Sequence, residues 1–171
     1  MNATLHARGY DSDRLGASVF RILAGTALCS MATRNGSGSV HISMAFFCFS
    51  NDLLLYFLSH PASLHCRNLA RSPQMAVAVF DTHQIWGEPH AGLQLFGTGE
   101  QVGAEAHDQV RELYASRFPL YRESLTPTAA GMSPLSTSRN LTFYRFLPRQ
   151  LQILDEWEFG EEVFIHATVL R

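Results

Sequence analysis

The sequence LCSMATRNGSGSVHISMAFFCF, residues 28–49, contains two strand-like segments separated by an Asn-Gly pair. Asn35-Gly36 is a strong signal for a turn between antiparallel strands, because both residues tolerate the left-handed backbone that such turns need. The sequence therefore predicts a β-hairpin formed by residues 26–33 and 39–49. In its second strand the side chains alternate between two faces, one of which carries Val40, Ile42, Met44, Phe46 and Cys48.

Helices and a buried strand are expected on both sides of this hairpin. Residues 12–25 have helical apolar spacing, with Asp11 or Ser12 as the N-cap and Gly25 at the end. The unbroken apolar run LLLYFLS, residues 53–59, is typical of a strand that is covered on both faces. A short helix over residues 63–70, with Ser63 as its N-cap, follows this strand. A longer amphipathic helix is expected over residues 104–117.

The rest of the chain predicts further strands and a single domain. Strands are expected at residues 75–80 and 92–102 and in the three segments LTFYRFL, QLQIL and VFIHATVL. Residues 119–139 contain Pro and Gly without a clear period, so they predict a long loop. We expect a flexible N-terminal arm over residues 1–11 and one domain over residues 12–171. Many antiparallel strands with few helices predict a mainly β (α+β) fold, such as a small β-barrel.

The charge composition excludes several classes of function. The chain has 171 residues and a formal net charge of -2, and all 13 of its positive charges are Arg. A chain without Lys has neither a Schiff-base lysine nor the lysine of a phosphate-binding P-loop. The small net charge also argues against a nucleic-acid partner, which would favour a basic surplus. Any anion site must therefore use Arg, His, hydroxyl groups or backbone N–H groups.

Other motifs are too weak to predict a site. The three Cys residues form no CxxC pair, and the eight His residues show no compact metal-ligand spacing. The glycines of GTGEQVG, residues 97–103, do not match the GxGxxG dinucleotide motif. The N-terminal segment lacks an apolar stretch, and no later stretch approaches 18 apolar residues. We therefore expect a cytoplasmic protein without a metal and without a membrane segment.

The order of these elements resembles the pyridoxamine 5'-phosphate oxidase-like split-barrel flavoproteins. The resemblance covers the helix, the hairpin, LLLYFLS, HPASLHCRNLARSPQMAVAVFD and LQLFGTGEQV, and it is closest over residues 26–103. It implies a six-stranded antiparallel split barrel with flanking helices. It also implies a homodimer that holds FMN in two equivalent grooves between the subunits.

The segment after LLLYFLS fits a phosphate site. A strand end followed by a capped helix brings hydroxyl groups, free N–H groups and a favourable helix dipole together. The candidate phosphate-binding residues here are Ser59, Ser63, His65, Arg67 and Asn68. The family usually carries a basic pair where this chain has Leu64 and His65, and Arg67 retains one certain positive charge. In the alternative interpretation, Ser63 only caps a surface helix and Arg67 is solvated.

The second strand of the hairpin corresponds to the strand that lies against the flavin ring in relatives. Main-chain N–H groups stabilise the negative charge that reduction builds near flavin N5 and N1, so the resemblance nominates Ser43, Met44, Ala45 and Phe46 for ring contact. Gln94, a polar residue on an alternating strand, is a candidate for contact from the second subunit. The alternatives are an ordinary barrel strand and a solvent-facing glutamine.

The resemblance implies an FMN-dependent oxidoreductase that passes hydride through flavin N5 and acts on an unassigned small molecule. Arg139 and Arg145 are candidates for an anionic substrate, and Trp157, within the acidic run 155–162, for stacking on a ligand; both also fit a solvated surface. No catalytic side chain is identified, and the groups near the site that titrate near neutrality are His41, His60 and His65. The alternatives are a protein that binds deazaflavin, one that binds haem through His166 or a histidine near the N-terminus, and a non-catalytic dimeric flavin-binding module.

Overall fold

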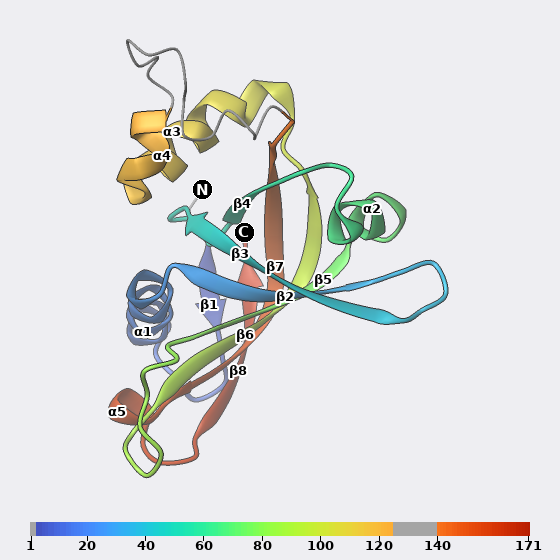
Figure 1. The fold of residues 1–171 in the computed structure, drawn as a ribbon. Coiled ribbons are helices and arrows are strands. Elements are labelled where there is room, and N and C mark those ends of the chain that lie inside the picture. Colours follow the sequence, from blue (N-terminus) through green and yellow to red (C-terminus); the bar gives the residue numbers. More distant parts are fainter. Residues whose placement is uncertain (1–2, 125–139) are drawn as a thin grey trace.

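The computed structural model describes residues 3–124 and 140–171, which form one antiparallel sheet with helices around it (Figure 1). In chain order the elements are β1 (Thr4–His6), α1 (Ser12–Gly25), β2 (Leu28–Arg34), β3 (Val40–Phe49), β4 (Leu55–Ser59), α2 (Leu64–Arg71), β5 (Gln74–Phe80), β6 (Ala91–Gln101), the 3-10 turn η1 (Ala104–Ala106), α3 (His107–Arg117), α4 (Pro119–Ser124), β7 (Thr142–Asp155), α5 (Glu156–Phe159) and β8 (Phe164–Leu170).

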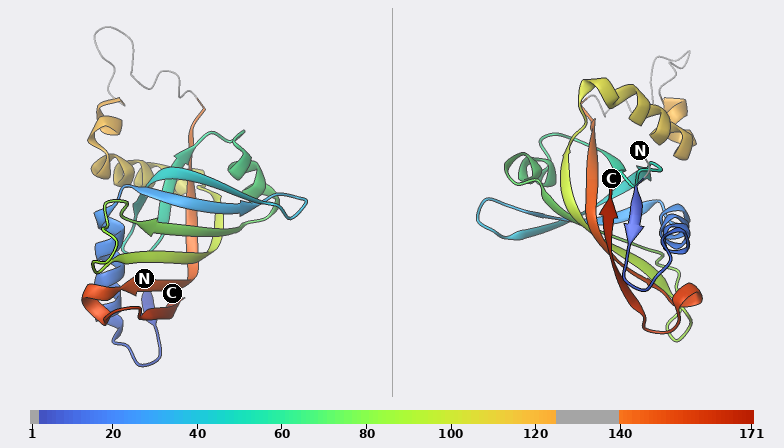
Figure 2. Two further views of the ribbon diagram at one scale, coloured as in Figure 1. Left: turned by 60° about the horizontal axis from the view of Figure 1, so that its bottom comes forward. Right: turned by 180° about the vertical axis from the view of Figure 1, so that it is seen from behind.

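Strands β2 to β7 close into a six-stranded barrel, as the two views of Figure 2 show. The strand order is β4-β3-β2-β5-β6, and the long strand β7 pairs with both β4 and β6 to complete the ring. Closure removes the unpaired edges that an open sheet would expose. Two further strands, β8 and β1, extend the sheet from β7. The predicted mainly β split-barrel architecture is thus confirmed.

The β2–β3 hairpin has a longer connection than a two-residue turn. Arg34 pairs with Val40, so residues 35–39 form the loop. The Asn35 side-chain oxygen accepts hydrogen bonds from the backbone N–H groups of Ser37 (3.0 Å) and Ser39 (2.9 Å). Gly38 provides the left-handed residue, with φ of 87°. The predicted turn is therefore present, and the side chain of Asn35 organises it.

Strand β4 is buried on both faces, as its unbroken apolar sequence predicts. Leu55 and Phe57 lie in the main core inside the barrel. Tyr56 belongs to a second apolar cluster, with Val110 and Tyr114 of helix α3. Because α3 covers the outer side of β4, residues 55–58 are apolar on both faces, and the polar Ser59 stands at the end of the strand.

Helix α1 begins and ends where the sequence indicates. The Asp11 carboxylate accepts a hydrogen bond from Arg14 N at 2.8 Å and so caps the first turn. Leu15, Val19 and Leu23 on the buried face have no exposed surface. These side chains anchor α1 to the barrel core.

Three segments differ from the prediction. Residues 119–124, expected at the start of a long loop, form helix α4, and residues 125–139 of that loop lie outside the described residues. Residues 4–6 of the expected flexible arm form β1, which pairs with β8. The segments LTFYRFL and QLQIL, expected as two strands, are one strand, β7. A register shift against β6 between Phe96 and Gly97 lets β7 continue through Pro148.

Among the helices of the described ranges, none combines the length and the apolar character needed to cross a bilayer. Within the same ranges, no group of three or more His, Cys, Asp or Glu side chains has an arrangement that could hold a metal ion.

Candidate cofactor site

A cradle of three polar side chains lies between the end of β4 and the start of α2. His65 Nε2 lies 2.7 Å from Ser59 Oγ and 3.1 Å from Ser63 Oγ, and the two hydroxyl oxygens are 3.3 Å apart. Ser63 is the N-cap residue of α2, but its side chain makes no capping hydrogen bond. Its hydroxyl group is therefore available to the cradle. The structure brings together three of the five predicted phosphate-binding residues.

The first turn of α2 adds a favourable field to this cradle. Its leading backbone N–H groups point toward the N-terminus of the helix, where they attract an anion. The helix has no acidic residue in its first turn. Serine hydroxyls, an imidazole and helix N–H groups are all donors to phosphate oxygens. The donor set therefore suits a phosphate monoester.

The other two predicted phosphate-binding residues lie outside the cradle. Asn68 is buried, and its amide nitrogen donates to Thr33 Oγ1 of β2 at 3.1 Å, which ties α2 to the barrel. Arg67 is exposed on α2. Asn68 thus has a structural contact of its own, whereas Arg67 contributes a positive charge on the same helix as His65.

A cysteine that the sequence analysis did not select lies against the cradle. Burial alone would raise the pKa of the Cys66 thiol, but hydrogen bonds from His65, Ser63 and Ser59 and from Tyr144 of β7 outweigh burial and lower its pKa to about 7. Burial, followed by hydrogen bonding and charge interaction with Cys66, raises the pKa of Tyr144. Tyr144 also stacks on Phe57 with ring centroids 5.5 Å apart, which supports the floor of the site.

Beside the cradle, strand β3 has an open edge. Its pairing with β4 covers only residues 47–49, whereas its pairing with β2 covers residues 40–46. On the side away from β2, residues 40–46 therefore have no strand partner among the described residues. Every second residue of a strand directs its N–H and C=O groups toward a given edge. The open edge offers main-chain donors next to α2, as Figure 1 shows.

The four residues predicted to contact the flavin ring all lie on this segment, but their side chains divide between two faces. Met44 and Phe46 project outward and are 76% and 54% exposed. Ser43 and Ala45 alternate with them and are partly buried, and Ser43 Oγ has no hydrogen-bond partner. Contact with a ring at the strand edge would therefore use the backbone of this segment rather than one set of side chains.

Gln94 lies on the outer face of β6, far from this edge within one chain. The strand registers form a row across the sheet that runs Met44, Ser30, Ala78, Gln94, Gln152 and His166. Gln94 and Met44 are three strand intervals apart, or about 14 Å at the usual spacing. A single protomer does not bring Gln94 to the β3 edge, so its contact with a ring there stays a prediction that needs a second subunit.

The residues predicted to bind an anionic substrate do not form a site in the described part of the chain. Arg145 Nε donates to Glu100 Oε1 at 2.6 Å, and the two residues form an ion pair across β6 and β7. Arg139 lies outside the described residues. Trp157 is exposed on α5, at a distance from the cradle (Figure 1).

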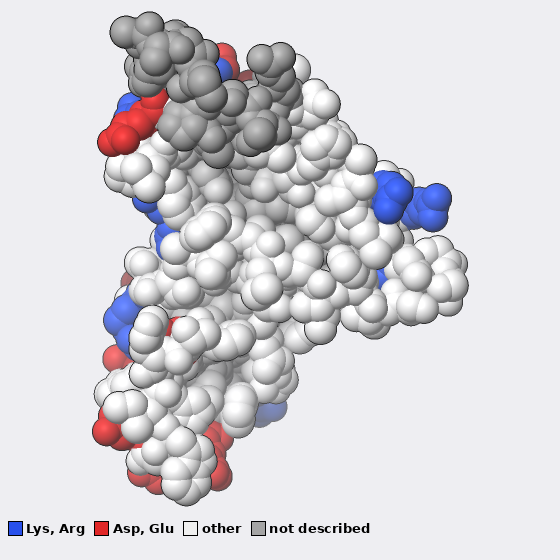
Figure 3. Space-filling model, viewed as in Figure 1, with Lys and Arg blue, Asp and Glu red and all other residues white. Residues whose placement is uncertain are grey.

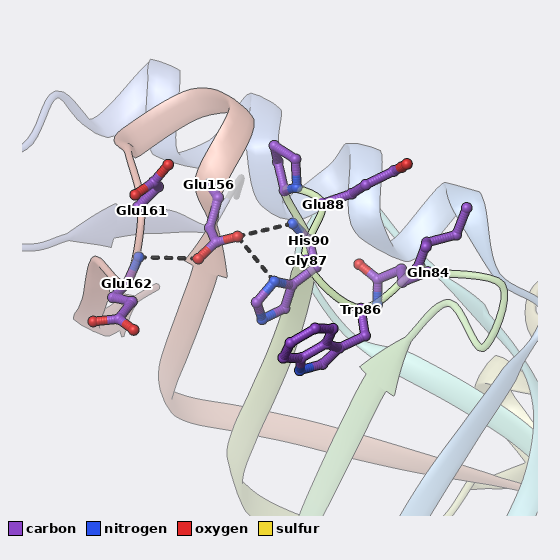
Figure 4. Close-up of a pocket in the computed structure, with 10 residues that line it drawn as sticks. Gln84, Trp86, Gly87, Glu88, His90, Glu156, Glu161 and Glu162 are labelled. Carbon is purple, nitrogen blue, oxygen red and sulfur yellow. Dashed lines mark hydrogen bonds and ion pairs between the residues drawn. The ribbon is translucent and has the colours of Figure 1, made fainter.

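The β5–β6 loop and the segment after β7 line an acidic cavity of about 600 Å³ (Figure 4). Glu156 holds the two segments together, since its carboxylate accepts hydrogen bonds from the backbone N–H groups of His90 and Glu162, both at 3.0 Å. Trp86, on the wall of this cavity, is 99% exposed. Carboxylates repel a phosphate group, so this cavity is a poorer phosphate site than the cradle.

Sequence reasoning missed Cys66, Tyr144 and Trp86. Cys66 follows His65 directly in the sequence, whereas Tyr144 comes to the site through the pairing of β4 with β7, which joins residues that are more than 80 positions apart. No local sequence pattern predicts that contact of Tyr144. Trp86 stands between turn residues, and only its exposure makes it conspicuous.

Comparison with solved structures shows the same fold at low sequence identity. A haem-binding protein from Mycobacterium smegmatis matches with a TM-score of 0.67 and 15% identity over 90% of this chain and 57% of its own. The haem storage protein HutZ from Vibrio cholerae matches with a TM-score of 0.63 and 18% identity over 81% of this chain and 92% of its own. An FAD-binding protein from Mesorhizobium loti matches with a TM-score of 0.61 and 18% identity over 90% of this chain and 97% of its own.

A search among curated proteins found no match. A family model described as pyridoxamine 5'-phosphate oxidase matches residues 17–136, which include the hairpin, the cradle and strands β5 and β6. This match covers more than half of the chain and agrees with the closed six-stranded barrel. The chain therefore belongs to the pyridoxamine 5'-phosphate oxidase family.

Proposed function

We propose that this protein is an FMN-dependent oxidoreductase that acts on a small molecule. The observation that carries the proposal is the cradle of Ser59, Ser63 and His65 beside the open edge of β3. The cradle suits the phosphate of FMN, and the open edge suits the polar rim of a flavin ring. When bound, FMN would supply the capacity to accept a hydride and to pass it on.

The chain's own residues would bind and orient the cofactor. The two serine hydroxyls and the His65 imidazole would hold the phosphate, supported by the N-terminus of α2. Main-chain N–H groups of residues 43–46 would donate hydrogen bonds to the ring. These groups do not titrate, so their contribution would be the same at every pH. No side chain in the described residues is assigned as a proton donor.

We infer that the cofactor site is completed by a second copy of the chain. The face drawn in Figure 3 has few charges at its centre, where β2 and β3 cross the molecule in Figure 1. The side chains of Val40, Ile42 and Met44 project from β3 with 66–76% exposure. Beside this ridge, β2 and β5 carry the small residues Ser30, Ala32, Ala76 and Ala78. A two-fold axis would pack each ridge against the partner's band of small residues.

Haem binding is a second candidate. Two structural neighbours are a haem-binding protein and a haem storage protein. His166 is exposed on β8 and lines a surface pocket of about 310 Å³ together with Phe96, Gln152 and Thr168. An exposed imidazole beside an aromatic ring is a reasonable axial ligand for a haem iron. The residues that line the pocket at His166 do not favour phosphate binding there.

Titration of the purified protein with FMN, riboflavin and hemin distinguishes these functions. We expect quenching of FMN fluorescence at micromolar concentrations, weaker binding of riboflavin, and at least about tenfold weaker FMN binding in His65→Ala. His83→Asn, an exposed histidine on the β5–β6 loop, is the control and should bind FMN normally.

A protein that ignores FMN but gives a haem absorption band, lost in His166→Ala, would replace the flavin proposal with haem binding. FMN binding without oxidation of any reduced nicotinamide or other reductant would indicate a non-catalytic flavin-binding module. Binding of a deazaflavin coenzyme would be tested by the same titration, followed through the absorption of that coenzyme.

A further inference from the structure

The cradle contains an imidazole, a side chain that exists in a neutral and a positively charged form. Ser59 and Ser63 are neutral donors, and two ionisable groups contact both hydroxyl groups: the His65 imidazole and the Cys66 thiol. Of the two, only His65 can become positively charged. The chain contains no Lys, and within the described structure the hydrogen bond that joins Arg67 to the cradle residues comes from its backbone N–H, which donates to Ser63 O at 3.0 Å, and not from its guanidinium group. A protonated imidazole donates through both ring nitrogens and carries a positive charge, whereas the neutral ring can present Nε2 as an acceptor.

The neutral form of His65 is therefore the weaker partner for an oxyanion, because it carries no charge and, in one of its two tautomers, presents a lone pair at Nε2. In the absence of an anion, Ser59 Oγ at 2.7 Å can donate its proton to Nε2. An incoming phosphate oxygen needs donors at that place, and a lone pair on Nε2 would repel it. In the tautomer that leaves Nε2 unprotonated, proton uptake converts Nε2 from acceptor to donor and frees both hydroxyl protons for the ligand.

We propose that His65 makes oxyanion binding in the cradle dependent on pH, so that protonation of His65 strengthens the binding of a phosphate monoester and loss of that proton weakens it. This inference rests on the proposed assignment of the cradle as the cofactor's phosphate site. It predicts that the retention of FMN, and not only its turnover, follows the protonation of one histidine.

The groups around His65 reinforce this direction. Cys66 faces it from α2, and its thiol, with a pKa of about 7, adds a negative charge as the pH rises. Tyr144 faces the cluster from β7, and burial, the first cause, raises its pKa, so it stays neutral in this range. Arg67 and Arg71 on α2 remain positive throughout. Glu100 on β6 and Arg145 on β7 are paired with each other. Rising pH therefore removes positive charge from the cradle and adds negative charge beside it.

Sulfate is the appropriate probe, because it remains a dianion throughout the relevant range. Its binding should be measured by calorimetry from pH 5.5 to 8.5 at constant ionic strength. We expect sulfate affinity in the wild-type protein to fall as the pH rises; the proton of His65 alone accounts for a fall of up to about tenfold per pH unit, and ionisation of Cys66 would make the fall steeper. Affinity that changes less than about threefold over the whole range would overturn the inference.

Three variants and one control assign the effect to His65. His65→Arg keeps a permanent charge, and its sulfate affinity should remain nearly constant with pH. His65→Asn keeps a donor without a charge and should bind sulfate weakly at every pH. This variant tests the assignment if the larger arginine disturbs folding. Cys66→Ala should retain the pH dependence of sulfate binding. A pH dependence that disappears in Cys66→Ala and persists in His65→Asn would overturn the assignment to His65. His83→Asn should behave as the wild type.

FMN titrated in the same buffers separates this inference from the proposed function. FMN that binds with pH-independent affinity, together with a flat sulfate response, would overturn the pH dependence and leave the flavin assignment standing. Sulfate binding that falls with pH, in a protein that binds no FMN, would support the pH-dependent cradle and overturn the flavin assignment.

Discussion

Single side chains explain why the cradle forms at the start of α2. Ser63 occupies the N-cap position, yet its hydroxyl group lies near His65 instead of the helix backbone. Cys66 is almost fully buried behind it, with 2% exposure. All three cysteines are buried, but only Cys66 has hydrogen bonds from the cradle. Burial, the largest cause, raises the pKa of Cys29 and Cys48 to about 12, whereas these hydrogen bonds hold the pKa of Cys66 near 7.

The low pKa of Cys66 predicts a distinctive dependence of stability on pH. A thiol whose pKa is lower in the folded state than its ordinary value of 9.0 stabilises the fold above pH 9 and loses that contribution as the pH falls toward 7. The difference in unfolding free energy between the wild type and Cys66→Ala should therefore increase in favour of the wild type from pH 7 to pH 9. Urea denaturation at both values measures it, and an equal difference at both would contradict the shift.

Gly97 predicts a steric effect at the register shift between β6 and β7. A Cβ at this position would lie 2.0 Å from the backbone oxygen of Leu147. Gly97→Ala should therefore lower the unfolding free energy by at least about 2 kcal/mol, because backbone must move. Gly16→Ala is the matched control: it lies within α1 with no atom within 4 Å of the added Cβ, and should raise stability by about 0.5–1 kcal/mol. Similar denaturation midpoints for both variants would contradict this explanation.

Packing between elements depends on a cation at the junction of α3, α1 and β3. Arg117 of α3 donates to the backbone oxygens of Leu23 (2.8 Å) and Thr26 (2.6 Å), at the C-terminal end of α1. Its guanidinium group also lies 4.9 Å from the ring centroids of both Phe47 and Phe49. One side chain thus satisfies helix-end carbonyl groups and packs on two aromatic rings.

Removal of this contact should destabilise the protein without changing the cradle. Arg117→Ala is expected to cost about 2–4 kcal/mol of unfolding free energy, since two charge-assisted hydrogen bonds and the ring contacts are lost. Arg117→Lys keeps the charge but not the forked donor. Its unfolding free energy should lie between those of the wild type and Arg117→Ala. Chemical denaturation gives the order, and sulfate binding at pH 6 serves as a control for the intact site. A lysine variant as stable as the wild type would show that charge alone is sufficient.

For the barrel as a whole, the apolar ridge on β3 is the main feature that a single chain leaves exposed. Ile42 and Met44 of β3 are 66% and 76% exposed. Strand β3 crosses the middle of the view in Figure 1, where the surface in Figure 3 has few charges. A contiguous apolar surface of this kind is costly in water and marks an interface in many proteins.

The proposed homodimer predicts that one charge on this ridge separates the subunits. Ile42→Glu should shift the protein from dimer to monomer in sedimentation velocity at micromolar concentration, and FMN binding should weaken with it. Trp86→Glu, at a residue 99% exposed on the β5–β6 loop, is the control and should remain dimeric. A wild-type protein that sediments as a monomer would contradict the proposed two-subunit site.

Local patterns in the sequence predicted most elements of this fold. The Asn35-Gly36 pair, the cap at Asp11 and the apolar run of β4 each act over a few residues, so each is visible without a structure. The absence of Lys already limited an anion site to Arg, His, hydroxyl and backbone donors. The helix over residues 119–124 and the continuity of β7 were not predicted, because proline positions suggested breaks that the fold accommodates.

The sequence alone determined the hairpin, the capped helices and the chemical types available to a site. Only the tertiary structure decided which of those groups meet. Pairing of Leu55 with Phe146 closes the barrel, and the same pairing places Tyr144 beside Cys66 and His65. Pairing of β3 with β4 stops at Phe47, which leaves the edge of residues 40–46 open beside the cradle. These contacts join residues far apart in the chain, so periodicity, which reports only on near neighbours, contains no record of them.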